Sequence, residues 1–441
     1  MISTSAIIIL LAVLIFCLLL GVPIGFALGL SGIITIWTSV GTDFMIQIPI
    51  TLHSSLSDFV FVAIPLYVLM GEILYHGKSG ERIFMVAHRL LRKIKGGTGV
   101  AGVSAFSFFS AIVGSSMTSV VTIGKIAIPE MIKQNYSKKL SFGLSAVGGS
   151  LGILIPPSIP LILYASLSGS SPGKLFIAGI IPGVLLAALL SVYAIIMAPK
   201  TKENFIDKDG STDLNDNYET SATLVEKRGS ILVALPDLIL PIIVLGGIYA
   251  GIYTPTEAAG VGVIYSLIVC LLIHRSLKVK LLPKVLVNSA KTSTMLLTVV
   301  VGALVFGSSL TLIGLPQYLS GFITDLSVSP WVILLLMNII WLTMGFFLEV
   351  VSILLITTPI FYPIAMSLGF DPIWFGIIMV INMELAVITP PIGMNLFALK
   401  SLFPNESMKL IIKSVLPFVL MVVMVLVIVW FFPQVALVLV N

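Results

Sequence analysis

The sequence has little charge. Only 10% of its 441 residues are Asp, Glu, Lys or Arg, and 58% are hydrophobic, whereas a soluble domain is about 25% charged and roughly 45–50% apolar. Apolar runs of about 18 residues or more, long enough to cross a bilayer as a helix, recur along it. The composition therefore predicts an all-α polytopic membrane protein. The candidate spans are residues 7–37, 59–75, 142–167, 176–198, 235–253, 258–273, 287–311, 375–399 and 410–432.

Cysteine and histidine are also scarce, which argues against several kinds of chemistry. Cys17 and Cys270 both lie in apolar spans, so they provide neither a disulfide framework nor a metal-ligand spacing. The four histidines are scattered near span ends. The sequence has no phosphate-binding loop and no nucleophile with a plausible base beside it. An intramembrane enzyme is therefore a remote alternative, and we expect no cofactor and no nucleic-acid partner.

Basic residues are missing from two connectors between candidate spans. Residues 41–57 and 313–329 contain no Lys or Arg. Of the 24 Lys and Arg residues, 22 fall in five other connectors, at residues 78–95, 133–139, 200–228, 275–291 and 400–413. Because cytoplasmic connectors carry the excess of Lys and Arg, these five are predicted to be cytoplasmic. The two basic-free connectors and a third at residues 166–174, which contains one Lys, are predicted to be external. Counting spans then places the N-terminus in the cytoplasm and the C-terminus outside.

Proline pairs interrupt two of the apolar spans. ILIPPSIPLILYA contains Pro156-Pro157, and VITPPIGMNLFAL contains Pro390-Pro391, 234 residues later. For a single proline, a kink healed by neighbouring helices is the simpler explanation. Non-helical backbone at membrane depth is tolerated where it is buried in protein or lines a wet cavity. A pair that recurs in register therefore predicts two functional breaks.

A stretch interrupted by small and polar residues precedes each proline pair. In the first half, FFSAIVGSSMTSVVTIGKIAIPE enters and leaves beside basic connectors, which predicts a re-entrant hairpin opening to the cytoplasm with its tip near 114–116. In the second half, WLTMGFFLEVVSILLITTPIF follows an external connector, so this hairpin, with its tip near 345–350, opens outward. Opposite topologies in two halves are the inverted-repeat design of many secondary transporters.

This design predicts scaffold and transport regions joined by a polar cytoplasmic linker, whose low apolar content keeps it solvated. The predicted regions are a scaffold at 1–96 and 231–330, a first transport repeat at 97–198 (hairpin 97–135, broken helix 141–167), the linker at 199–230, and a second transport repeat at 331–441 (hairpin 331–366, broken helix 372–399).

The two tips and two breaks are expected to form two pseudo-symmetric cation sites. Sodium is a hard cation that prefers oxygen ligands, which hydroxyls and unwound carbonyls supply without a buried negative charge. The apolar candidates can act only through their carbonyl oxygens. The candidate ligands are Ser110, Val113, Gly152, Ile155 and Pro156 in the first half, and Gly345, Ala386, Thr389 and Ile392 in the second.

Polar side chains near the tips are the candidate substrate ligands. They are Ser115, Ser116, Ser119, Glu349, Ser352 and Asn395. Ser115 and Ser119 share one helical face with Thr122 because their spacing is i, i+4 and i+7. Alternatively, the Thr122 hydroxyl bonds its own i−4 carbonyl.

Charged residues inside spans are functional hypotheses because burying them is costly. Glu72, Lys125, Glu349 and Glu384 qualify. Glu384 lies two turns before the second break and could orient a hairpin by hydrogen bonding. Glu257, in GIYTPTEAAG, lies at a span start, where a helix N-terminus favours a carboxylate, and is predicted to be a helix cap.

Four motifs, GSSMTS, LGILIPPSIPLILY, GIYTPTEAAG and ITPPIGMNLFAL, occur together in this order. With them the chain resembles, over nearly its whole length, the large membrane subunit of tripartite ATP-independent periplasmic (TRAP) transporters. The resemblance implies an elevator-type fold in a bacterial inner membrane and sodium-coupled uptake of an organic acid such as sialic acid or a C4-dicarboxylate. It also implies two partners: a small four-helix membrane subunit, expected here as a separate chain, and a periplasmic substrate-binding protein.

The resemblance carries the family's sodium sites onto the tip and break residues named above. This sequence departs from the family pattern at three places: Val113 where Ser is frequent, Ala386 where some members have Thr, and Glu349 where Asp is commoner. The first two departures remove side-chain ligands, so the sodium stoichiometry stays open. A stand-alone sodium/anion carrier of the same superfamily is the alternative within transport.

Overall fold

The computed structural model of the chain describes residues 4–199, 231–325, 328–391 and 393–440. Within these ranges the chain forms helices and no strands. Seven helices are long and apolar enough to cross a membrane, and the bent pair α4 (Val60–His76) and α5 (Ser79–Leu91) makes an eighth if it is one span. This agrees with the membrane class that the composition predicts. The predicted linker lies outside the described residues, except for residue 199.

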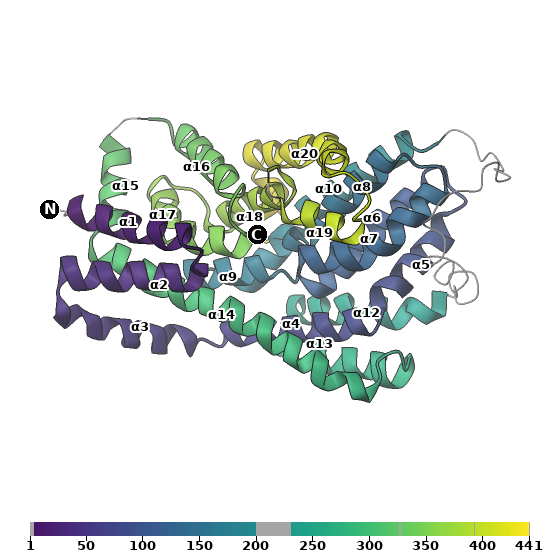
Figure 1. Cartoon of the computed structure of the whole chain (residues 1–441), viewed down its shortest axis with the longest axis horizontal. Helices are drawn as coiled ribbons and strands as arrows, with labels where there is room; N and C mark the ends of the chain where they lie inside the picture. Colours follow the sequence, from purple (N-terminus) through teal and green to yellow (C-terminus); the bar gives the residue numbers. More distant parts are fainter. Residues whose placement is uncertain (1–3, 200–230, 326–327, 392, 441) are drawn as a thin grey trace.

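The first predicted span, residues 7–37, is wrong as a single helix. It consists of α1 (Thr4–Leu19) and α2 (Ile24–Thr35), which pack side by side and run in opposite directions (Figure 1). Gly21 between them has a φ of +74°, which glycine adopts without steric cost. Pro23 directly precedes α2, where its missing N–H does no harm. The turn carries no polar residue, so hydropathy alone did not reveal it.

The two basic-free connectors contain helices rather than extended loops. The first holds α3 (Gln47–Leu56) and the second holds α15 (Leu315–Asp325). α3 packs against α14 (Leu282–Leu312), and α15 packs against α17 (Val350–Ser367). Sequence reasoning found the charge asymmetry of these segments but not their helices.

The 31-residue α14 is the longest helix and contacts several N-terminal helices. Its closest approach is to α2, where both helices carry glycine, which has no side chain. A Cβ at Gly25 would lie 2.7 Å from the Thr298 carbonyl oxygen, and one at Gly32 would lie 2.9 Å from that of Val305. Small residues let two membrane helices pack backbone to backbone. This contact explains Gly25 of the GVPIGFALG segment and Gly32, which lies just beyond it.

Two helical units of the same order occupy the two halves of the chain. Each has two helices joined by a short turn and then a helix interrupted by a proline pair, and both Pro–Pro bonds are cis. A long helix follows each unit. The first is α6 (Gly97–Val113), α7 (Ser116–Lys133), α8 (Lys138–Leu154) and α9 (Ile159–Ser168), followed by α10 (Pro172–Ile196). The second is α16 (Pro330–Met344), α17, α18 (Pro372–Ile388) and α19 (Met394–Leu402), followed by α20 (Met408–Phe431) and the short α21 (Gln434–Leu437).

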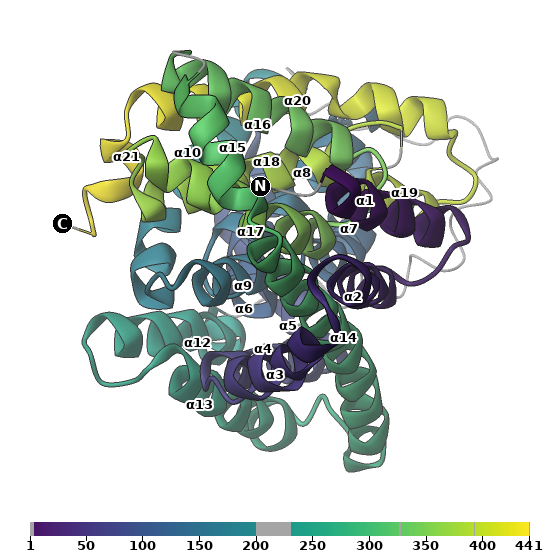
Figure 2. The same ribbon diagram turned by 90° about the vertical axis from the view of Figure 1, so that its left-hand side faces the viewer.

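The remaining helices are α12 (Ile231–Tyr249), which packs against α5 and α13, and α13 (Pro255–Leu267), which packs against α4. α13 begins with a capping box: the Thr254 N–H donates to Glu257 Oε2 (2.8 Å), and the Glu257 N–H donates to Thr254 Oγ1 (3.3 Å). This confirms Glu257 as a cap. In Figures 1 and 2, α3, α4, α12, α13 and α14 lie in the lower part of the molecule, and α8, α10, α16, α18 and α20 lie in the upper part.

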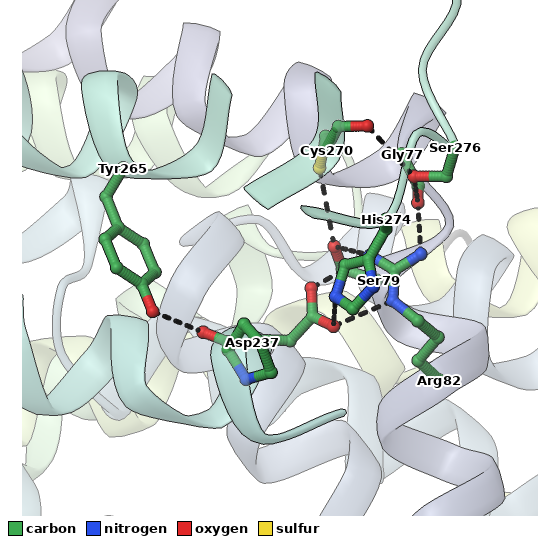
Figure 3. A network of polar contacts seen from close by, with 9 residues as sticks. Gly77, Ser79, Arg82, Asp237, Tyr265, Cys270, His274 and Ser276 are labelled. Carbon is green, nitrogen blue, oxygen red and sulfur yellow. Dashed lines mark hydrogen bonds and ion pairs between the residues drawn. The ribbon is translucent and has the colours of Figure 1, made fainter. Parts of the chain in front are cut away.

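A buried ion pair holds the bend between α4 and α5, which turn by 64° (Figure 3). Arg82 on α5 donates from Nε and Nη2 to the two carboxylate oxygens of Asp237 on α12, at 2.7 and 2.9 Å. Its Nη1 donates to the Gly77 carbonyl at the bend (2.7 Å), which also accepts from the Ser276 hydroxyl (2.7 Å). Asp237 was missing from the predicted set of intramembrane charges. Its partner is 155 residues away in sequence.

His274, which follows the span that ends at Ile273, completes this cluster. Its Nε2 lies 3.2 Å from Asp237 Oδ2 but lacks hydrogen-bond geometry. Burial lowers the pKa of His274, the nearby Arg82 lowers it further, and Asp237 partly opposes both. The positive charge that pairs with Asp237 is therefore that of Arg82, and His274 is neutral near pH 7.

Candidate functional site

The first break has a specific pattern of free carbonyl groups. Prolines have no N–H, so the proline pair deprives the carbonyls of Gly152 and Ile153 of the donors that a continuous helix would supply. Ser158 starts α9, accepting a bond from the Leu161 N–H (3.4 Å) and donating its hydroxyl to the Ile153 carbonyl. In the α8–α9 span, 94% of the most apolar 18-residue stretch is buried inside the protein, whereas the corresponding share in α20 is 39%. The broken backbone is therefore enclosed by protein.

The tip of the first hairpin, between α6 and α7, lies against this break. Gly114 at the tip has a φ of +63°, and a Cβ there would lie 2.9 Å from the Pro157 carbonyl oxygen. A Cβ at Gly152 would lie 2.9 Å from the Ser110 Cβ. The Ser110 hydroxyl is fully buried and has no hydrogen-bond partner among the described residues. Tip and break thus meet at an unpaired hydroxyl.

The two apolar candidates at this site turn their side chains toward other helices. A Cβ at Gly71 on α4 would lie 3.1 Å from Val113 Cγ1, and one at Gly183 on α10 would lie 2.6 Å from Ile155 Cγ1. Pro156, which directly follows Ile155, is buried. These residues can offer a cation only carbonyl oxygens.

The second break has a hydroxyl on the other side of its proline pair. Thr389 precedes the prolines, and its Oγ1 donates to the Leu385 carbonyl (2.5 Å). The second proline pair withholds i+4 donors from the carbonyls of Ala386 and Val387. Gly393, with a φ of +47°, starts α19. The predicted ligand Ile392 lies outside the described residues.

The tip of the second hairpin, between α16 and α17, also lies against a break. A Cβ on Gly345 at the end of α16 would overlap the side chain of Ala386 on α18. Glu349 directly precedes α17 and is partly exposed, whereas Ser352 is buried. The same tip-to-break contact therefore occurs in both halves.

Asn395 joins the two halves through its side chain. Its Oδ1 accepts the hydroxyl of Ser116 on α7 at 2.7 Å, and its Nδ2 donates to the Ala146 carbonyl on α8 at 2.8 Å. Asn395 is fully buried and Ser116 nearly so. Two predicted substrate residues from opposite halves are therefore in direct contact, although neither side chain is free of intramolecular bonds.

The hydroxyls along α7 bond mostly to their own helix. Ser119 Oγ donates to the Ser115 carbonyl (2.8 Å), and Thr122 Oγ1 donates to the Thr118 carbonyl (2.7 Å). The i−4 alternative is thus the observed one for Thr122. The Ser115 side chain caps α7 by accepting from the Thr118 N–H at 3.4 Å. Of this stripe, only Ser115 is in the solvent-accessible part of the tip.

Sequence reasoning missed one polar pair and misjudged one acid. Asn382 on α18 donates to the Asn338 side chain on α16 at 2.6 Å, and both are buried. Their pattern could not be recognised without the contact, because 44 residues separate them. Glu384 is fully buried, and neither of its oxygens has a hydrogen-bond partner in the described chain. The prediction that Glu384 orients a hairpin by hydrogen bonding is therefore wrong within the part of the chain that the structure describes.

The arrangement of helices is similar to that of a solved transporter structure. The structure of the Alcanivorax borkumensis YdaH transporter matches with a TM-score of 0.59, covering 96% of this chain and 98% of that one. Its sequence identity is 16%, so this likeness concerns the fold alone.

The sequence gives the more specific result. The chain belongs to the family of the DctM component of tripartite ATP-independent periplasmic transporters, whose family model matches residues 11–435. The C4-dicarboxylate large permease DctM of Pseudomonas aeruginosa is 39% identical over 94% of each chain. The sialic acid large permease SiaM of Vibrio cholerae is 31% identical, over 94% of this chain and 93% of its own. The chain is thus the large subunit of a TRAP transporter, and not an enzyme.

Proposed function

We propose that this subunit carries a small organic anion into the cell together with sodium ions, after a periplasmic binding protein delivers the anion. The observation that supports this most is the contact of a hairpin tip with a proline-broken helix in each half of the chain. Broken helices at membrane depth place free carbonyls beside substrates and coupling ions. Membership of the TRAP family supports the transport class.

Two sodium sites are proposed at the two contacts. The first uses Ser110, whose buried hydroxyl has no partner within the described ranges, with carbonyls of the first break. The second uses Gly345 with the carbonyls around Thr389. Neutral oxygens of this kind suit a hard cation. In the second site Thr389 already donates its hydrogen, but its oxygen lone pairs remain available to a cation.

The anion is proposed to lie between the two tips, with Ser115 and Asn395 among its ligands. Bound sodium would supply positive charge beside a carboxylate. The relatives named above act on two different organic acids, a C4-dicarboxylate and sialic acid. The proposal therefore specifies an organic acid and leaves its skeleton to a ligand screen of the binding protein.

Movement is proposed to follow an elevator mechanism, in which the two helical units move against a scaffold built from α2, α4, α12, α13 and α14. The glycine contact of α2 with α14 and the Arg82–Asp237 pair support a rigid scaffold. The inverted topology of the two units belongs to the same proposal, as does the division into scaffold and transport regions.

The charge rule, applied to the observed helices, changes the proposed side of the N-terminus. Because α1 and α2 are two helices, one more crossing separates the N-terminus from the basic connectors. In Figure 1 the N-terminus lies at the left end, whereas the end of α10 and the start of α12, which flank the basic linker, lie at the right. We therefore propose that both termini are periplasmic in a bacterial inner membrane.

Reconstitution into liposomes tests the function and its partners. Uptake of a labelled organic acid is expected only with an inward sodium gradient, the binding protein and the small membrane subunit together. Full uptake by this chain alone would favour the stand-alone carrier, and uptake without a sodium gradient would refute sodium coupling.

A further inference from the structure

We propose that Ser158 is a positioning residue of the first sodium site, a role that rests on the function proposed above. Its hydroxyl bonds the Ile153 carbonyl, so that, of the two α8 carbonyls that the prolines release, the Gly152 carbonyl is the one left for the cation. Ser158 is not among the ligands predicted from the sequence. It is fully buried, directly after the first proline pair.

The proline pair frees two carbonyls at the end of α8. The Ile155 N–H donates to the Leu151 carbonyl (2.7 Å), so the regular bonding of α8 reaches that point. The next two donors would come from prolines, which have none. The carbonyls of Gly152 and Ile153 are therefore both released, and a buried carbonyl without a partner costs free energy.

A single hydroxyl can satisfy only one of these two carbonyls. Ser158 Oγ donates its single hydrogen to Ile153 and, as an acceptor, caps the Leu161 N–H. Gly152 keeps its carbonyl, and Gly152 is the residue that packs against Ser110. The Ser110 hydroxyl, which is unpaired within the described chain, and the Gly152 carbonyl, whose helical donor Pro156 lacks, thus belong to neighbouring residues. Ser158 determines which carbonyl stays available.

The second break shows that this arrangement is particular to the first. The offset of 234 residues places Ile392 at the position of Ser158 and Thr389 at that of Ile155. The hydroxyl of Thr389 bonds the Leu385 carbonyl, one residue before the two released by prolines. A hydroxyl selects between released carbonyls in the first break only. Loss of Ser158 should therefore change one of the two sites.

Three substitutions at Ser158 separate this role from simple stabilisation. Ser158→Ala removes both bonds, and Ser158→Thr keeps the hydroxyl. Ser158→Gly removes the hydroxyl but retains most of the capping preference, since Gly is itself a favoured N-cap residue. The matched control is Ser150→Ala, which removes another fully buried hydroxyl of α8, bonded to the Val147 carbonyl at 2.8 Å.

Two measurements are made on the complete transporter with its partners. The first is the sodium concentration for half-maximal uptake, with the substrate KM measured at saturating sodium. The second, on purified protein without transport, is the rise in melting temperature with sodium. For Ser158→Ala and Ser158→Gly we expect the sodium concentration for half-maximal uptake to rise about fivefold, which is the change that the loss of one modest hydrogen bond produces. The substrate KM should not change. The sodium-dependent rise in melting temperature should shrink in parallel.

The control Ser150→Ala and the conservative Ser158→Thr should keep the wild-type sodium curve. If Ser158→Gly and Ser158→Ala both match Ser150→Ala while the wild type requires sodium, the positioning role is refuted and the proposed function stands. If the wild type shows no sodium dependence in either measurement, the proposed function fails and this role fails with it. If Ser158→Ala does not fold, Ser158→Gly decides alone.

Discussion

Replacing Asp237 with Asn would show how strongly the scaffold depends on one buried ion pair. Arg82 reaches both carboxylate oxygens, and the two side chains are 9% and 0% exposed. Asp237→Asn leaves the guanidinium buried without a counter-charge, and breaking a buried pair in this way costs about 3–5 kcal/mol. Against a total stability of about 5–15 kcal/mol, such a loss is large. It would also release α5, which packs on the first hairpin, from α12.

The assay is denaturant unfolding of the purified subunit in detergent, followed by tryptophan fluorescence. Glu81→Gln is the matched control, because it breaks the exposed Lys78–Glu81 pair of the same helix, 4.0 Å apart, for which about 0–1 kcal/mol is expected. The double variant Arg82→Met, Asp237→Leu should recover most of the lost stability, since well-packed apolar residues often replace a buried pair without cost. A loss below about 1 kcal/mol in Asp237→Asn would refute the reasoning.

Three further predictions concern the site and its surroundings. Thr389→Ala and Ser110→Ala should each raise the sodium concentration for half-maximal uptake, by different factors because only Thr389 has an intramolecular bond; identical, unaltered curves would count against both assignments. Asn395→Ala should lower stability by about 1–3 kcal/mol, because it leaves the buried Ser116 hydroxyl without its acceptor, whereas the Ala146 carbonyl keeps its bond within α8, and it should abolish uptake. A stable, active variant in the same unfolding and uptake assays would contradict this. The lowered pKa of His274 means that this side chain binds a proton more readily in the unfolded chain, so the stability of the fold should decrease as pH drops below about 6.5. Unfolding measured at several pH values should show a shallower decrease in His274→Gln than in the wild type. An equal slope in the two proteins would refute this prediction.

The parts of the fold that depend on backbone chemistry were predictable from the sequence. Prolines and glycines act on their own neighbourhood, so the breaks and the tip glycines Gly114 and Gly345 could be located without knowing the packing. The cap at Glu257 followed for the same reason, because its partner Thr254 is three residues away. In each case the controlling interaction lies within a few residues.

The parts that depend on distant contacts were not predictable. Arg82 and Asp237, or Asn338 and Asn382, become pairs only when their helices pack, and the sequence holds no local sign of it. The turn at Gly21 was hidden for another reason, since its residues are all apolar and a hydropathy window runs through them. Ser158 had a recognisable signal, a serine at a helix start after prolines, but its hydroxyl bond across the break required coordinates.

The Asn395 bridge also limits how a new substrate preference can arise. Its side chain connects the start of α7 with α8 in the first half while belonging to α19 in the second. A substitution that reshapes either half therefore alters a surface shared by both. If the anion binds at the tips as proposed, engineering a different acid preference would require paired changes in segments about 280 residues apart, chosen together and not one at a time.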